Sequence, residues 1–86
     1  MIRLEVVRGQ EVGRALESDQ DLVRIGRAER NDLVVTDHHV SGEHASIAFN
    51  GEHWVLRDHH STNGTRVERN GETIDLATQP GRELVL

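Results

Sequence analysis

The 86-residue sequence predicts an all-β fold, an antiparallel β-sandwich of two sheets with little or no helix. Short runs rich in Val, Ile and Leu are separated by glycine, asparagine and aspartate at spacings of roughly 8–12 residues, which is typical of sandwiches. Several runs alternate apolar and polar residues, as strands with one buried face do. No stretch repeats its apolar residues with the helical period of about 3.6 residues, so packed sheets are the expected way to bury a core.

The N-terminal part of the chain supplies four expected strands. The first covers Ile2–Arg8. Its residues Ile2, Leu4 and Val6 alternate with polar ones and are expected to share a buried face. The other three are shorter apolar runs bounded by turn residues: Val12–Glu17, Leu22–Gly26 and Leu33–Val35.

The middle of the chain predicts a hairpin. The runs His44–Phe49 and Trp54–Asp58 flank Asn50-Gly51. Asn-Gly is the strongest short hairpin signal, because both residues tolerate positive φ. Alternation within the first run predicts a second shared face, formed by Ala45, Ile47 and Phe49.

The C-terminal part predicts a second tight hairpin and a final strand. Arg66–Glu68 and Glu72–Ile74 flank Asn70-Gly71, and the last run is Glu83–Leu86, in which three of four residues are apolar. No linker or repeat separates these runs, and a chain this short has one core. We therefore expect a single domain over residues 1–86.

Composition excludes several classes of function. The net charge of −5 repels nucleic acid phosphates, and Phe49 and Trp54, the only aromatic residues, are too few for a base-stacking surface. No apolar run approaches a bilayer span, the N-terminus does not resemble a signal peptide, and there is no cysteine. We expect a cytoplasmic protein that binds neither nucleic acid nor membrane.

Three polar connections carry the candidate functional residues: Ile25–Leu33, Asp37–His44 and His59–Thr65. Because the loops of a sandwich cluster at its two ends, such segments can converge on one site. Taken singly, their residues are weak signals. Arg27 is typical of a solvated arginine, and Ser41 is typical of a local turn hydrogen bond.

Taken together, these segments resemble the forkhead-associated (FHA) domain family. The similarity is tight over residues 22–67 and loose on the flanks, and the matching elements are Ile25-Gly26-Arg27, Asn31-Asp32-Leu33, Val40-Ser41-x-x-His44-Ala45, Trp54-Val55-Leu56-x-Asp58 and Ser61-x-Asn63-Gly64-Thr65. The resemblance implies a Greek-key-like β-sandwich whose loops at one end bind phosphothreonine peptides. It implies a module that is not an enzyme, needs no cofactor and binds phosphothreonine proteins in Ser/Thr-kinase signalling.

The resemblance also assigns the phosphopeptide-binding residues. Arg27 would pair with the phosphate, because a guanidinium fork suits a dianionic group, and Ser41 would donate its hydroxyl to it. Thr62 would frame the phosphate and the threonine methyl, and Asn63 would hydrogen-bond the peptide main chain. Many relatives carry Arg, Lys or Asn at position 42, where Gly42 offers only its backbone N–H.

Five further residues have supporting roles by the same resemblance. Gly26, His44 and Gly64 would shape the loops without touching the ligand, with the His44 imidazole tying loops together. Arg30 and His39 are auxiliary candidates, and Arg30 could replace the contact that Gly42 lacks.

Two rival chemistries are disfavoured. The pairs His38-His39 and His59-His60 suggest a zinc site, because imidazole is a common zinc ligand. Adjacent histidines in a strand point to opposite faces, however, so no metal site is expected. A hydrolase built on Ser41, His44 and Asp37 is disfavoured because no oxyanion-hole loop is recognisable.

The main alternative is a phosphate-independent protein interaction module on the same fold, which Gly42 favours. A further expectation concerns the C-terminus. Relatives usually continue past the strand matched by Glu83–Leu86 into a final strand, and an unpaired strand edge is a template for pairing with another chain. We expect weak self-association through this edge, and a larger protein of which the chain is part.

Overall fold

The computed structural model describes residues 1–86 and confirms the all-β fold. Its only helical elements are two short 3₁₀ turns, Leu76–Thr78 and Pro80–Arg82, and neither has the length and hydropathy needed to cross a membrane. Each observed strand overlaps an expected one. The strands are β1 (Ile2–Glu5), β2 (Ala15–Ser18), β3 (Leu22–Gly26), β4 (Leu33–Val34), β5 (Ala45–Phe49), β6 (Trp54–Asp58), β7 (Arg66–Arg69), β8 (Glu72–Asp75) and β9 (Glu83–Val85).

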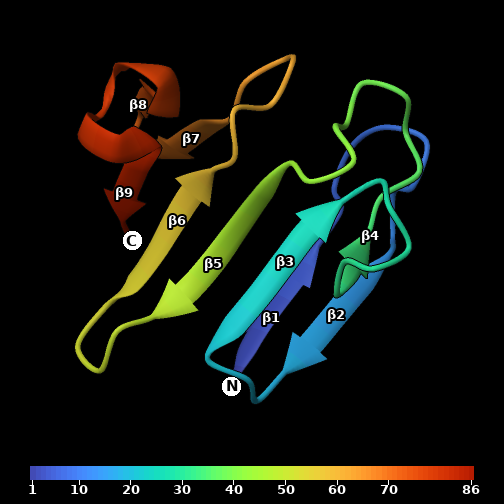
Figure 1. The fold of residues 1–86 in the computed structure, drawn as a ribbon, viewed down its shortest axis with the longest axis horizontal. Helices are drawn as coiled ribbons and strands as arrows, with labels where there is room; N and C mark the ends of the chain where they lie inside the picture. The colour runs from blue at the N-terminus through green and yellow to red at the C-terminus, as the bar shows by residue number, and fades with distance from the viewer.

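A five-stranded sheet forms one layer, in the order β4-β3-β5-β6-β9 (Figure 1). In its register Ile47 of β5 lies opposite both Val23 of β3 and Leu56 of β6, which lines up the apolar residues of the central strands. Strands β3 and β4 pair in parallel, which departs from the antiparallel prediction. The reason is that the loop of residues 27–32 carries the chain back beside β3, so that both strands run in the same direction.

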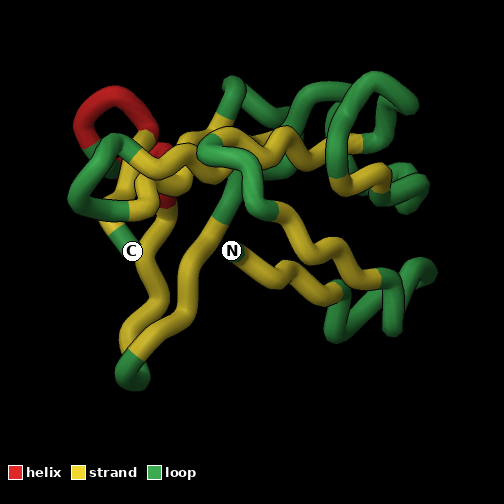
Figure 2. Tube along the Cα trace, turned by 90° about the horizontal axis from the view of Figure 1, so that it is seen from below, coloured by secondary structure: helices red, strands yellow, loops and turns green.

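Two separate two-stranded sheets, β1–β2 and β7–β8, accompany the large sheet. Figure 1 shows the β1–β2 hairpin over the β3–β4 side of the large sheet, and Figure 2 shows it as a layer apart from that sheet. Ile2 and Leu4 of β1 and Val67 of β7 pack against the core cluster of Ala45, Ile47, Leu56 and Leu76. The predicted second sheet of the sandwich therefore exists in two parts.

The central strand β5 is buried on both faces rather than on one. Ala45 and Ile47 face the core as predicted, and Ser46 on the opposite face is also buried. Phe49 is 36% exposed, so its predicted place on the buried face is wrong. It lies where β5 runs into the exposed hairpin loop, and its ring packs on Trp54 with the centroids 5.3 Å apart.

Both Asn-Gly pairs turn hairpins, but in different ways. Asn70 and Gly71 have φ angles of 51° and 79° and form the whole two-residue connection between β7 and β8. The connection between β5 and β6 covers residues 50–53, which are the residues between the two predicted strands. There the Asn50 side chain accepts hydrogen bonds from the backbone N–H groups of Glu52 and His53.

Candidate functional site

The three polar loops converge at one end of the large sheet. The Arg27 N–H donates to the Ser41 carbonyl at 3.0 Å, and the Ala28 N–H donates to the Gly42 carbonyl at 3.1 Å. The Ser41 hydroxyl oxygen accepts from the Thr62 N–H at 2.9 Å. Ser41 thus touches both neighbouring loops, as the sequence predicts of a shared site.

Gly26 lets the first two loops approach closely. A Cβ atom on this residue would lie 2.3 Å from the Gly42 carbonyl oxygen and 2.8 Å from the Asn31 side-chain nitrogen. Its φ is not in the left-handed region, so the backbone conformation does not require a glycine here. The absence of a side chain allows the contact. Asn31 then joins the loops by donating to the carbonyls of Ala28 and Gly42 at 2.8 and 2.6 Å.

His44 ties the second loop to the third. Its Nδ1 accepts from the Ser41 N–H at 3.0 Å, and its Nε2 lies 2.9 Å from the Gly64 carbonyl oxygen. These partners require a neutral imidazole with its proton on Nε2. Gly64 has a φ of 80°, which glycine adopts without strain. Because both ring nitrogens are occupied, His44 has no free nitrogen to activate Ser41, and the arrangement is not that of a hydrolase.

Asp58 organises the third loop from beneath. Its carboxylate is buried and accepts hydrogen bonds from the Ser61 N–H, the Ser61 hydroxyl and the Thr65 hydroxyl, the last at 2.7 Å. Burial alone would raise the pKa of Asp58, but the hydrogen bonds from Ser61 and Thr65 outweigh it and hold the pKa below its ordinary value. The charged carboxylate therefore fixes the loop that carries Thr62 and Asn63.

The groups left exposed at this end are those that the sequence assigns to ligand binding. The Arg27 guanidinium forms no ion pair or hydrogen bond within the chain, and the Gly42 N–H has no protein acceptor. Thr62 and Asn63 are exposed, and the Asn63 amide donates to the His39 carbonyl at 2.7 Å. The site lies open on the surface, because none of these residues lines a cavity.

Arg30 lies in the same loop as Arg27 but is committed elsewhere. Its guanidinium pairs with Glu43 at 2.8 Å, and this arginine is the main reason that the pKa of Glu43 is lowered. Pairing leaves Arg27 as the uncommitted arginine of that loop.

Sequence reasoning gave no role to Asn31 or Asp58, although both stand in the matching elements. Both are polar and buried, at 8% and 2% exposure. The sequence does show a charged or amide residue within or beside an apolar run at each of these two positions. It does not show which distant segments such a residue contacts, and its role in ordering the loops depends on those contacts.

Comparison with known proteins supports the family resemblance that the sequence motifs indicate. The family model Yop-YscD, "Inner membrane component of T3SS, cytoplasmic domain", matches residues 5–86. The FHA domain-containing protein FhaB of Mycobacterium tuberculosis is 38% identical over 66 residues, which cover 77% of this chain and 43% of FhaB. The chain thus spans less than half the length of that relative.

Two solved structures share the fold over 98% of this chain. One is the solution structure of the FHA domain of an Arabidopsis thaliana hypothetical protein, with a TM-score of 0.74, 30% identity and 68% of that chain covered. The other comes from a structural and functional analysis of phosphothreonine-dependent FHA domain interactions, with a TM-score of 0.69, 27% identity and 76% of that chain covered.

The chain belongs to the FHA domain family. Within this FHA domain, the residues of the matching elements are the ones that bring the loops together: Gly26, Asn31, Ser41, His44, Asp58 and Gly64. The Yop-YscD match is to a related family. The chain is therefore a member of a family of binding modules.

Proposed function

We propose that this FHA domain binds phosphothreonine-containing segments of partner proteins in a Ser/Thr-kinase pathway. The observation that carries the proposal is the uncommitted guanidinium of Arg27, whose backbone N–H is bonded to the Ser41 carbonyl at 3.0 Å. The Ser41 hydroxyl uses its oxygen to accept from Thr62 and keeps its proton to donate. An arginine fork, a hydroxyl and the free N–H of Gly42 together supply donors to the three oxygens of a phosphate.

Specificity for a peptide comes from the neighbouring residues. Asn63 already donates to the His39 carbonyl, which orients its amide and leaves the amide oxygen to accept from a peptide N–H. Thr62 stands next to it and offers a methyl group for contact with the phosphothreonine methyl. A phosphoserine peptide is expected to bind more weakly, because it lacks that methyl group.

Titration of the chain with one peptide in phosphothreonine, phosphoserine and unphosphorylated forms tests this function. Arg27→Ala should weaken phosphothreonine binding at least about tenfold through the loss of a charge-assisted contact. Arg57→Ala is the matched control, because it removes the same charge from β6 outside the loops. Equal affinities of Arg27→Ala and the unchanged chain would overturn the proposal.

A second candidate function is phosphate-independent protein binding on the same fold. One observation favours it, the absence of a side chain at Gly42. Binding of phosphorylated and unphosphorylated peptides with equal affinity would select it. Gly42→Lys sharpens the comparison, because a Cβ atom at this position meets nothing nearer than the Ala28 Cβ at 4.0 Å. On the phosphate-dependent function this substitution tightens binding of the phosphorylated peptide only.

The rest of the proposal describes the setting of the module. We place it in the cytoplasm, as a part of a larger protein, with no catalytic activity, cofactor, nucleic acid or membrane partner of its own. Self-association through the C-terminal edge belongs to the same proposal. Strand β9 ends the five-stranded sheet and pairs only with β6, and Val85 and Leu86 are about half exposed.

A further inference from the structure

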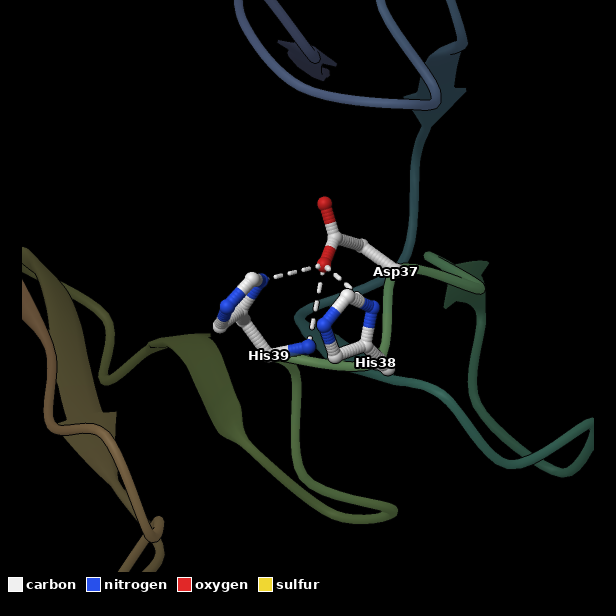
Figure 3. A group of neighbouring side chains, drawn as sticks. All are labelled: Asp37, His38 and His39. Carbon is white, nitrogen blue, oxygen red and sulfur yellow. Dashed lines mark hydrogen bonds and ion pairs between the residues drawn. The ribbon is translucent and has the colours of Figure 1, made fainter.

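The turn that precedes Ser41 gathers three side chains able to bind a metal. The Val40 N–H donates to the Asp37 carbonyl at 3.0 Å and closes the turn, and Figure 3 shows His38 and His39 around the Asp37 carboxylate. One ligand atom from each of these three residues lies within 4.8 Å of the others. The two rings are neighbours, with centroids 4.1 Å apart, because the histidines occupy a turn and not a strand. The sequence-based argument against a metal site therefore fails for this pair.

The carboxylate of this group is held in place before any ligand arrives. Its Oδ1 accepts from the His39 N–H at 2.9 Å and lies 3.0 Å from the His39 Nδ1. Asp37 thus directs its carboxylate towards two exposed imidazole rings.

The spacing and the donor types fit a zinc ion. Zinc binds nitrogen and oxygen at about 2.0–2.2 Å, so two ligand atoms in a tetrahedral site lie about 3.4 Å apart. The Asp37 Oδ1 lies 3.0 Å from the His39 Nδ1 and 4.0 Å from the His38 Nδ1, which bracket that separation. Two imidazoles with one carboxylate suit zinc rather than magnesium or calcium, which prefer oxygen ligands alone.

We propose that Asp37, His38 and His39 form a zinc-binding site, with Asp37 Oδ1 and one imidazole nitrogen from each histidine as ligands. The remaining coordination position faces solvent and is open to water.

Bound zinc would act on the neighbouring phosphopeptide residues through the backbone, and this consequence rests on the proposed function. The His39 carbonyl accepts from the Asn63 amide at 2.7 Å, and Ser41 follows two residues later. An ion that fixes the turn removes motion that peptide binding would otherwise have to remove, so the two ligands stabilise each other's binding. The ion also adds positive charge near the phosphate position.

Titration of the untagged chain with ZnCl₂ alone, without peptide, tests the site directly. The unchanged chain should bind one equivalent. His38→Ala, His39→Ala and Asp37→Asn should each bind at least about tenfold more weakly. Asp37→Asn keeps an oxygen that accepts from the His39 N–H, so the turn persists, and circular dichroism verifies the fold of each variant. His53→Ala is the matched control, an exposed histidine in the loop between β5 and β6, and MgCl₂ is the control ion. Absence of saturable zinc binding, or losses no larger than that in His53→Ala, would overturn the site.

A second titration measures the link to the peptide site. Phosphothreonine peptide should bind at least about fivefold more tightly with one equivalent of zinc than with a chelator, and Asp37→Asn should abolish the difference. Equal affinities in the two conditions contradict the link. A peptide that binds in neither condition contradicts the proposed function, and the zinc titration still decides the metal site by itself.

Discussion

The loop end of the molecule and its C-terminal edge are ordered by different means. At the loop end, hydrogen bonds made by Asn31 and His44 connect three polar loops, and Asp58 accepts hydrogen bonds from Ser61 and Thr65 within the third. The C-terminal edge is a single strand, β9. Its last residue, Val85, and the following Leu86 leave apolar surface exposed.

The difference shows how a small sandwich can hold irregular loops still. No buried side-chain nitrogen or oxygen lacks a hydrogen-bond partner, so every buried polar side chain of the loop end is paired. The network holds the backbone and leaves Arg27 free, whereas the side chains of Val85 and Leu86 at the C-terminal edge stay about half exposed. Loss of one network member should therefore cost more than loss of any exposed residue.

The largest loss of stability is expected from Asp58→Ala. The substitution leaves the hydroxyls of Ser61 and Thr65 and the Ser61 N–H without their acceptor and should lower the free energy of unfolding by about 2–4 kcal/mol. Chemical denaturation measures it. A loss below that of an exposed substitution such as Arg57→Ala would show that the carboxylate does not hold the loop.

Gly26→Ala comes next, because the new Cβ would overlap the Gly42 carbonyl. The two loops must separate, which should cost about 1–3 kcal/mol and weaken peptide binding as well. Gly42→Ala is the matched control, since its Cβ meets only the Ala28 Cβ at 4.0 Å. Equal melting temperatures for the two variants would contradict the close approach of the loops.

His44→Ala should have a smaller effect. It leaves the Ser41 N–H and the Gly64 carbonyl unpaired, but the site is half-buried and water can replace part of the loss. We expect about 1–2 kcal/mol from thermal unfolding, together with weaker peptide binding. A variant with unchanged stability that binds no peptide would instead make His44 a direct ligand contact.

The dependence of the free energy of unfolding on acid pH tests the charge on Asp58. Its pKa is lower in the folded chain than the ordinary value of 3.8, so its contribution is complete above about pH 4 and is lost as pH falls towards the folded pKa. Asp58→Asn lacks this titration. The stability difference between the unchanged chain and Asp58→Asn should therefore shrink below about pH 4 and stay constant from pH 5 to 7. A difference that does not change across the acid range would contradict the lowered pKa.

The smallest effect is expected at the C-terminal edge. Sedimentation over a wide range of concentrations should detect weak self-association through β9, which Val85→Lys should reduce because charge on an edge strand opposes pairing. Arg69 already donates to the Val85 carbonyl at 2.9 Å and covers part of this edge, which limits the expected affinity. A strict monomer at all concentrations would remove the edge as an interaction surface.

The sequence alone determined the nine strands and the polar loops between them. Those features follow from local patterns, because alternation marks a strand and Asn-Gly marks a turn wherever the rest of the chain lies. The matching elements also singled out Arg27, Ser41, Thr62 and Asn63, and the structure places these residues on three adjoining loops.

Only the tertiary structure decided which residues of those loops are already paired with other residues of the chain. It paired Arg30 with Glu43, packed Gly26 against Gly42 and buried Asp58 beneath Ser61. It also set β3 parallel to β4 and brought the rings of His38 and His39 together. The contacts at the loop end join residues up to 24 positions apart, as His39 and Asn63 are, and no local period encodes which distant groups will meet.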